Sequence, residues 1–417
     1  MDTYIIPAPL SGTVAAIASK SDAHRALICA ALSDAPTDIE IATSSKDIDA
    51  TADCLKALGA KITRKEGVFH VEPITQVRPA PVLDCSESGS TLRFMLPVAA
   101  VTAPKASFLG HGRLPERPIK ELADEMKRHG VSFDRDKLPF TISGCLGPGD
   151  FYLPGNVSSQ YITGLLLALP HLSARSEIHL TSKLESTSYV SMTLSSLRRF
   201  GVKILPSVDG YIIPSSASYR SPGRLRTDAD WSNAAFFLTA GAVSGPVTVT
   251  GLDLRSNQGD KAILDCLEAF GAELDIQERA ITVSGGQLHG AWFDLHDIPD
   301  LLPALAVVAT RAEGKTVFAN GSRLRIKESD RLSAVADMIR SLGGIAHETS
   351  DGIVIEGHPL HGGTVNGYND HRIVMASAIA ASIASGPVTI TGSQAVNKSY
   401  PGFWQDFSSL GGNQHVK

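Results

Sequence analysis

The 417-residue sequence has few of the features that mark secreted, membrane-spanning or metal-binding proteins. Its five cysteines are scattered and contain no CxxC pair, which indicates reduced thiols rather than disulfides or a zinc site. The longest apolar runs, such as Leu165–Leu169, are far too short to span a bilayer. The amino terminus lacks a basic segment followed by an apolar core, so we expect no signal peptide. Together these absences predict a cytoplasmic protein that does not contact a membrane.

Charge is also modest. Charged residues make up 19% of the chain, and the formal net charge is −5. A net acidic chain is poorly suited to nonspecific binding of nucleic acid, so we expect no nucleic-acid partner. Hydrophobic residues make up 43%, an ordinary share for a globular protein, and the length allows two or three domains. Any cationic site must therefore be local and assembled by the fold.

The sequence is, however, rich in self-similarity. A helical pattern closed by a glycine recurs six times, about 70 residues apart, at Gly59, Gly130, Gly201, Gly271, Gly343 and Gly411. Glycine at a helix end is typical of a left-handed C-terminal cap. After each of the first five glycines come a short strand, a polar turn and a second strand. We expect the sixth copy to stop after its helix, because the sequence ends there.

A second series of helices is in phase with the first. Its members have a polar first turn and are otherwise apolar almost all round, and they begin near Lys20, Glu87, Ser158, Asp230, Asp300 and Asp370. A helix that is apolar on every face is buried, and its polar first turn caps it. The pattern predicts a βαβαββ unit repeated six times, three in each of two domains. Helix starts that converged on the cleft between the domains would favour anions there.

Cations recur at these repeat ends. The stretch Gly321–Arg331 alone carries four cations and two carboxylates between a strand-like run and a helical pattern. One interpretation is a solvated helix start with i,i+4 ion pairs, or simple capping. The alternative is an anion site, which is favoured because further cations occupy corresponding ends of a net acidic chain. The recurring cations are Lys20, Arg25, Arg117, Lys327, Arg331, Arg372 and Lys398.

Two carboxylates and several hydroxyl groups stand among these cations. A carboxylate directed at an anion site is unfavourable unless it binds hydroxyl groups or moves protons, which makes Asp300 and Glu328 candidate catalytic residues. Gly89 allows a ligand to approach the backbone closely. The hydroxyl and amide groups of Ser158–Gln160, with Ser186 nearby, suit a polyol or phosphate. For each of these polar residues, helix capping alone is the competing interpretation.

Several motifs in one order carry a family resemblance. They are SKSxxxR at Ser19–Arg25, SGSTLR at Ser88–Arg93, ERPI at Glu116–Ile119, SSQY at Ser158–Tyr161, RIKESDR at Arg325–Arg331, NDHR at Asn369–Arg372, and Lys398 before Tyr400-Pro401. With these, the sequence resembles the 5-enolpyruvylshikimate-3-phosphate (EPSP) synthase family over nearly its full length. The resemblance implies a two-domain inside-out α/β barrel. One domain would comprise residues 20–227, the other residues 1–19 and 228–417, with the active site in the cleft between them.

The resemblance also implies a reaction in the shikimate pathway to chorismate and the aromatic amino acids. The enolpyruvyl group of phosphoenolpyruvate would pass to the 5-hydroxyl of shikimate 3-phosphate through a tetrahedral intermediate, releasing phosphate. We expect no metal, no organic cofactor and a monomer. The two substrates bring two phosphates and two carboxylates, and the recurring cations match that charge.

Residue roles follow by the same resemblance. Asp300 would orient the 5-hydroxyl and accept its proton, Glu328 would move the proton at the methylene carbon, and Lys20 would share in proton transfer. Phosphoenolpyruvate would be held by Lys20, Gly89, Arg117, Gln160, Arg331, Arg372 and Lys398. Shikimate 3-phosphate would be held by Lys20, Ser21, Arg25, Ser158, Ser159, Gln160, Ser186, Tyr189, Asp300 and Lys327.

Two positions depart from the family pattern, and two rival functions are open. Glu87 and Arg323 stand where asparagine is common, so their roles are undecided. Gly89 lacks a side chain that would crowd phosphoenolpyruvate, which predicts inhibition by glyphosate. The sister enzymes that act on UDP-N-acetylglucosamine carry a cysteine or aspartate in the loop corresponding to Gly112–Arg117, and this loop has neither. A noncatalytic phospholigand-binding protein would not need both Asp300 and Glu328.

Overall fold

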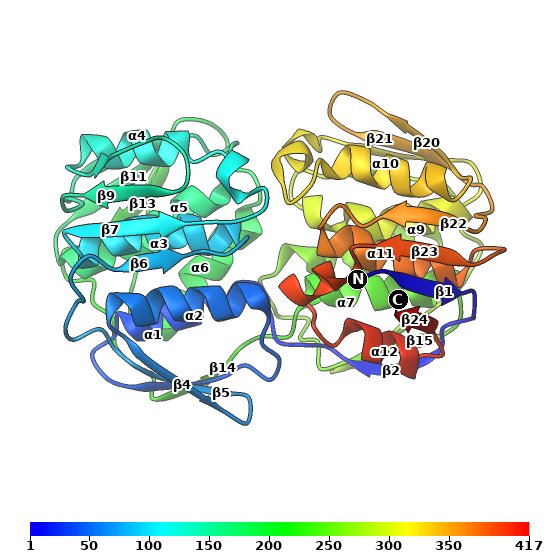
Figure 1. The fold of residues 1–417 in the computed structure, drawn as a ribbon, viewed down its shortest axis with the longest axis horizontal. Coiled ribbons are helices and arrows are strands. Elements are labelled where there is room, and N and C mark those ends of the chain that lie inside the picture. The colour runs from blue at the N-terminus through cyan, green and yellow to red at the C-terminus, as the bar shows by residue number, and fades with distance from the viewer. Residues whose placement is uncertain (417) are drawn as a thin grey trace. The chain divides into compact units, whose positions relative to one another are not determined.

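The computed structural model describes residues 1–416 and divides the chain into two compact units (Figure 1). Unit 1 comprises Met1–Ile17 and the chain from Asp228 onward, and unit 2 comprises Ala18–Thr227. The sequence predicts that the chain crosses from one domain to the other after residue 19 and crosses back after residue 227. Each unit has its own hydrophobic core. All five cysteines are free, and none of the described helices combines the length and apolarity that a membrane span requires.

Each unit is built from three four-stranded sheets with the same strand pattern. The pattern is plainest in unit 2, in the sheet ordered β6-β7-β9-β8. Its first two strands are parallel and are joined by a buried helix, and its other pairs are antiparallel. In chain order this repeat consists of β6 Val82–Asp84, α3 Gly89–Thr102, β7 Lys105–Leu109, the 3₁₀ helix η1 Leu114–Glu116, α4 Lys120–Arg128, β8 Ser132–Phe133 and β9 Phe140–Ser143.

The other two repeats of unit 2 follow this βαβαββ order. One consists of β10 Asp150–Leu153, α5 Ser159–Ala168, η2 Leu169–Leu172, β11 Ser176–Leu180, α6 Thr187–Arg199, β12 Leu205–Pro206 and β13 Gly210–Ile213. The other consists of α1 Lys20–Ala31, β3 Thr37–Glu40, α2 Lys46–Leu58, β4 Lys61–Lys65 and β5 Val68–Glu72, completed by β14 Arg224–Arg226. Because β14 pairs in parallel with β3, the last strand of this unit supplies the first strand of that sheet.

Unit 1 repeats the arrangement. Its contiguous repeat consists of β18 Trp292–Asp294, η4 Pro299–Leu301, α9 Leu302–Arg311, β19 Lys315–Ala319, η5 Ser322–Ile326, α10 Arg331–Ser341, β20 Ile345–Glu348 and β21 Ile353–Glu356. A second consists of β2 Gly12–Ala15, α7 Trp231–Val243, β15 Val247–Thr250, η3 Gly259–Ala262, α8 Ile263–Phe270, β16 Glu273–Ile276 and β17 Ala280–Ser284.

The sixth repeat does not stop after its helix, so that expectation is wrong. It consists of β22 Gly363–Asn366, α11 His371–Ser382, β23 Val388–Thr391, η6 Ser393–Lys398, α12 Phe403–Ser409, β24 Asn413–Val416 and β1 Thr3–Ile6. β1 lies between β23 and β24 and pairs antiparallel with both. The amino-terminal strand therefore supplies the last strand of the repeat, and the two ends of the chain close one sheet.

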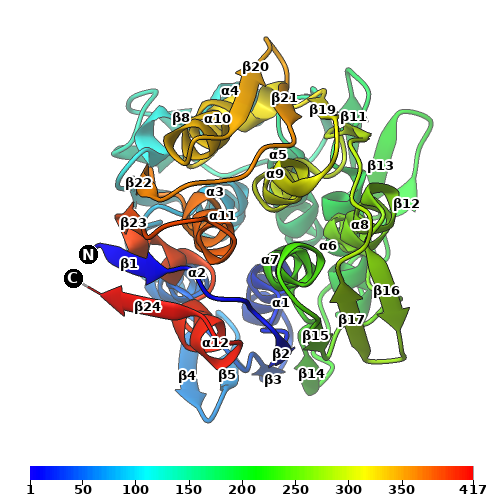
Figure 2. The same cartoon turned by 90° about the vertical axis from the view of Figure 1, so that its right-hand side faces the viewer.

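The predicted buried helices and glycine caps are confirmed. In unit 1, α7, α9 and α11 pack against one another, and Figure 2 shows them nearly end-on with the sheets around them. Nearly every residue of α7 and α11 is buried. All six glycines of the repeat have a positive φ, between 75° and 126°, which favours glycine because other side chains are strained there.

Close packing of α3 against α5 gives a stability prediction. A Cβ on Gly164 of α5 would clash with the backbone oxygen of Arg93 and lie 3.0 Å from Cγ of Pro97, both on α3. Since the backbone oxygen cannot move without separating the helices, Gly164→Ala is expected to destabilise the protein by about 1–3 kcal/mol. The measurement is the urea unfolding midpoint followed by circular dichroism.

The control is Gly147→Ala in the same unit, where a Cβ would meet only a backbone oxygen at 3.5 Å. An unfolding midpoint for Gly164→Ala as high as that of this control would contradict the packing argument.

Candidate active site

The starts of several helices in unit 2 are linked by side chains. Lys20, the first residue of α1, forms an ion pair of 2.8 Å with Asp47 in the first turn of α2. The hydroxyl of Thr91, in the first turn of α3, lies 2.7 Å from the hydroxyl of Thr51 on α2. Ser88 caps α3 and Ser158 caps α5, each by accepting a backbone N–H of the first turn. Ser158 thus acts as a helix cap, its binding role stays a prediction, and Ser159 is the first residue of α5.

Arg25 joins the start of α1 to α6. Its guanidinium donates to the backbone oxygen of Ser21 at 2.6 Å and to that of Tyr189 at 3.0 Å, and Nε donates to the Thr193 hydroxyl at 2.8 Å. Burial lowers the pKa of Arg25 to about 10, so the group is still charged at neutral pH. Ser186 is a buried residue in the left-handed conformation at the start of α6. Arg25 thus holds three predicted shikimate 3-phosphate residues, itself included, in one neighbourhood.

A second arginine joins α3, α5 and the proline-rich loop. Arg93 Nη1 donates to Gln160 Oε1 at 2.6 Å, and Nη2 donates to the backbone oxygen of Pro118 at 2.8 Å. Gln160 in turn donates to the Ser90 hydroxyl at 2.9 Å. Gln160 is therefore fixed at the start of α5 with its amide group turned toward the start of α3.

Gly89, the first residue of α3, is covered by Arg117. A Cβ at this position would lie 2.5 Å from Arg117 Nη1 and 2.6 Å from Cζ. The bare backbone is what allows the guanidinium to lie over the helix start, where the N–H groups also favour an anion. The structure thus brings these two predicted phosphoenolpyruvate residues together, and inhibition by glyphosate stays a prediction.

In unit 1 the corresponding cluster is centred on Arg331, the first residue of α10. Its guanidinium forms three ion pairs, with Asp300 at 2.6 Å, Glu328 at 2.6 Å and Asp370 at 2.8 Å. Only 1% of the residue is exposed. Burial alone would lower the pKa of Arg331, but the three carboxylates outweigh it and raise the pKa, so the group is a permanent cation.

Asp300 is surrounded by cations. Besides Arg331, Lys327 Nζ lies 3.4 Å from one of its oxygens, and Arg372 Nη2 lies 3.5 Å from the other. Burial alone would raise the pKa of Asp300, but the three cations, with Arg372 the strongest, hold it well below its ordinary value. Burial is also the largest influence on Lys327 and lowers its pKa. Asp300 is therefore ionised when the cations have no other anion to bind.

Arg372 and Lys398 complete the cluster. Arg372 donates to the backbone oxygen of Asp300 at 3.2 Å and to the Ser232 hydroxyl at 2.6 Å, linking the starts of α11, η4 and α7. Lys398, at the end of η6, donates to the backbone oxygen of Asn369 at 2.5 Å, directly before α11. Five of the six predicted residues of unit 1 are thus joined directly by ion pairs: Asp300, Lys327, Glu328, Arg331 and Arg372. Lys398 is joined to them through Asn369, which directly precedes Asp370.

Comparison with known proteins decides the family. The family model for EPSP synthase (3-phosphoshikimate 1-carboxyvinyltransferase) matches residues 5–407. The chain belongs to this family. The 3-phosphoshikimate 1-carboxyvinyltransferases of Clostridium perfringens and Clostridium kluyveri are each 41% identical to it, with coverage of 98% of this chain and of 98% and 97% of theirs.

Solved structures agree with the fold. The EPSP synthase from Acinetobacter baumannii matches with a TM-score of 0.83 at 24% identity, covering 100% of this chain and 99% of that one. The enolpyruvyl transferase NikO from Streptomyces tendae matches with a TM-score of 0.80 at 18% identity, covering 99% and 98%. The two-domain α/β architecture is therefore shared with both.

The two residues that depart from the family pattern have structural partners within their own units. The Glu87 carboxylate lies against Gly112, where an added Cβ would clash with it. Arg323 donates to the backbone oxygen of His296 at 2.7 Å, bracing the segment between β18 and η4. In both cases the charged group helps to shape a loop that borders the predicted site.

Two buried aspartates belong to the cluster of unit 1 although the sequence assigns them no role. Asp370 caps α11 by accepting the Arg372 backbone N–H, and it also accepts the Ser329 hydroxyl. Asp370 belongs to the NDHR motif, so this motif could have identified it from the sequence. Asp260 lies in η3, a short irregular segment with no apolar periodicity that could have placed it. Burial, and next the charge of Asp300, raise the pKa of Asp260 to about 6, against the pull of Arg372 and a hydrogen bond with Ser232.

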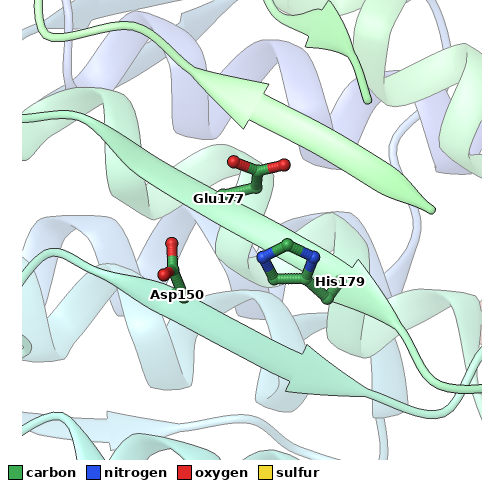
Figure 3. A group of neighbouring side chains, drawn as sticks. All are labelled: Asp150, Glu177 and His179. Carbon is green, nitrogen blue, oxygen red and sulfur yellow. The ribbon is translucent and has the colours of Figure 1, made fainter. Parts of the chain in front are cut away.

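Among the described residues, one group of side chains has metal-ligand spacing. Asp150, Glu177 and His179 each offer an atom within 4.8 Å of the others, from neighbouring strands (Figure 3). Glu177 already pairs with Arg175 at 2.7 Å, and His179 Nδ1 lies 3.1 Å from the Asp209 carboxylate. Asp150 begins β10, whereas α5 follows the other end of that strand. The group is thus separate from the helix starts, and we assign it no role in the site.

The raised pKa of Asp260 predicts a pH-dependent stability. A group whose pKa is raised on folding stabilises the fold fully below its ordinary pKa of 3.8, and this stabilisation is lost as the pH rises through about 6. Asp260→Asn cannot ionise, so the variant does not lose stability in this way as the pH rises. The variant is therefore expected to gain stability over the wild type between pH 5 and pH 8, by on the order of 1 kcal/mol.

The measurement is the free energy of unfolding at both pH values. The exposed Asp265 on α8 provides the matched control, Asp265→Asn, which should follow the wild type. Parallel pH profiles for Asp260→Asn and the wild type would show that Asp260 does not titrate in this range.

Proposed function

We propose that the protein catalyses the reaction of its family, in which the enolpyruvyl group of phosphoenolpyruvate is transferred to the 5-hydroxyl of shikimate 3-phosphate and phosphate is released. The observation that carries the proposal is that two carboxylates suited to proton transfer, Asp300 and Glu328, are bound by one buried arginine amid further cations. A protein that only bound phosphates would have no need of carboxylates there, because they repel the ligand.

The two units supply different parts of the site in this proposal. Unit 2 holds shikimate 3-phosphate through Arg25, through Lys20 and through the hydroxyl and amide groups at the starts of α1, α5 and α6. Arg117 over Gly89, with Arg331, Arg372 and Lys398 from unit 1, holds phosphoenolpyruvate. Lys327 and Asp300 contribute to the shikimate 3-phosphate side.

Substrate binding changes the basicity of Asp300. Its pKa is held down by Arg372, Lys327 and Arg331 when no substrate is present. Substrate phosphates and carboxylates share these cations, so their pull on Asp300 weakens and its pKa rises toward its ordinary value. Asp300 therefore becomes a better proton acceptor when the 5-hydroxyl is in place, which couples the onset of chemistry to binding.

The reaction then needs one proton to be added and removed. Glu328 or Lys20 delivers a proton to the methylene carbon of phosphoenolpyruvate as the 5-oxygen attacks the adjacent carbon and Asp300 takes the hydroxyl proton. The resulting tetrahedral intermediate loses phosphate, and a proton leaves the new methyl group to restore the double bond. Arg331 holds Glu328 at 2.6 Å and so fixes the position from which it acts.

The decisive experiment compares acceptors. Phosphate release from phosphoenolpyruvate is measured with shikimate 3-phosphate, with UDP-N-acetylglucosamine and with no acceptor. We expect turnover with shikimate 3-phosphate alone. Turnover with the nucleotide sugar would assign the chain to the sister reaction, and substrate binding without turnover would indicate a binding protein.

Glu328→Gln tests the role of that carboxylate. The amide keeps the size of the side chain and a hydrogen-bond acceptor for Arg331 but cannot shuttle a proton. We expect kcat to fall by about 10²–10⁴-fold with little change in KM for either substrate. Glu313→Gln, an exposed glutamate of the same unit, is the control. A Glu328→Gln enzyme with wild-type kcat would remove Glu328 from the mechanism.

A further inference from the structure

A pocket that none of the roles above uses lies within unit 2. It is bordered by α4, by the segment Leu114–Lys120 and by the turn between β8 and β9. Its volume is about 400 Å³, within the range of sites that bind small organic molecules. All of the residues that line it belong to unit 2.

The walls of this pocket are mainly apolar. They include Leu92, Leu114, Ile119, Ala123 and Leu138, all of which are buried. Phe133 adds an aromatic face that is half-buried. Water against the apolar part of the lining has few hydrogen-bond partners there, so an apolar body that displaces it gains free energy. The walls therefore favour a ring-shaped hydrocarbon body over a sugar or a nucleotide.

Charges around this body favour an anionic group on it. The lining holds four cations against three carboxylates. Lys120 pairs with Asp124 at 2.5 Å, and Lys127 lies 3.6 Å from Asp124 and 3.5 Å from Asp136. Lys137, by contrast, forms no ion pair within residues 1–416. One cation thus remains available at the mouth of an apolar pocket, which matches a ligand with a single carboxylate.

The pocket shares a wall with the proposed phosphoenolpyruvate site. Arg117 and Pro118 line it, and Leu92 of α3 is adjacent in sequence to Arg93. The guanidinium of Arg117 covers Gly89, and Arg93 is bonded to the backbone oxygen of Pro118. An anion in the pocket would therefore attract the same arginine that is needed at the start of α3.

We propose that this pocket binds an apolar ring compound bearing one carboxylate, and that the bound compound weakens phosphoenolpyruvate binding by drawing Arg117 away from Gly89. The binding itself is independent of the reaction catalysed. Only the effect on phosphoenolpyruvate rests on the proposed function. The ligand would act against phosphoenolpyruvate without occupying its site.

The first test is a calorimetric titration of the full chain with 2-naphthoate and with its uncharged analogue 2-naphthamide. We expect the acid to bind more tightly than the amide. Lys137→Glu should weaken binding of the acid by about fivefold or more, the effect of reversing one partly exposed charge. Ala123→Phe, which fills the pocket, should abolish binding of both compounds.

Lys105→Glu is the matched control for the charge reversal. Lys105 is an exposed lysine at the end of the β7–β9 pair remote from Leu138, so the variant should bind like the wild type. Lys137 is equally exposed, so its replacement should leave the fold intact. Absence of binding, equal affinity for acid and amide, or affinity unchanged by both Lys137→Glu and Ala123→Phe would each overturn the pocket assignment.

The second test measures the KM for phosphoenolpyruvate by phosphate release with and without 2-naphthoate. We expect the KM of the wild type to rise with kcat unchanged, and the KM of Lys137→Glu to be normal and insensitive to the acid. Pocket binding without a change in KM would overturn the coupling to Arg117. A protein that turns over with no acceptor at all would refute the proposed function, while the titration would still decide the pocket.

Discussion

The buried guanidinium of Arg331 is the interaction on which the half-site of unit 1 depends. A charge with 1% exposure is tolerated only when it is paired and hydrogen-bonded, and Arg331 satisfies this by binding three carboxylates. Three negative charges around one positive charge would themselves be unstable. Lys327 and Arg372 restore the balance by binding Asp300 from two further elements. The starts of α9, α10 and α11 are therefore fixed relative to one another by charge.

Arg25 of unit 2 is stabilised in a different way. Arg25 donates to a hydroxyl and two backbone oxygens, and among the described residues it forms no ion pair. Its charge is thus oriented by neutral groups and is available to an anion, at the cost that burial lowers its pKa. In unit 1, by contrast, Lys327, Arg331 and Arg372 are paired with carboxylates. The two buried arginines are thus stabilised in different ways, Arg25 by neutral acceptors and Arg331 by carboxylates.

The helix starts could be predicted from the sequence because they repeat. The period located α1, α3, α5, α7 and α11 to within about two residues, and a capping residue such as Ser88 or Asp230 marked where each began. Asp260 could not be placed, because η3 has no periodicity and the side chain reaches the site only through tertiary packing. The pairing of β1 with β24 also could not be predicted from the sequence, because the two strands lie at opposite ends of the chain. Local patterns therefore identify elements, whereas long-range closure needs the structure.

Two other repeats are also completed by strands that are distant in sequence, and these strands adjoin the two segments where the chain passes between the units. β2 ends at Ala15 and pairs with β15 in unit 1, and α1 of unit 2 begins only a few residues later with Lys20. Where the chain passes back to unit 1, β14 first pairs with β3 in unit 2. Asp230 then caps α7 in unit 1, and its backbone N–H donates to the Ile17 backbone oxygen at 2.8 Å. Each crossing is thus held at both ends by hydrogen-bonded structure and leads directly into the first turn of a buried helix. The crossings therefore adjoin the first turn of α1, which carries Lys20, and the first turn of α7, whose Ser232 accepts a hydrogen bond from Arg372.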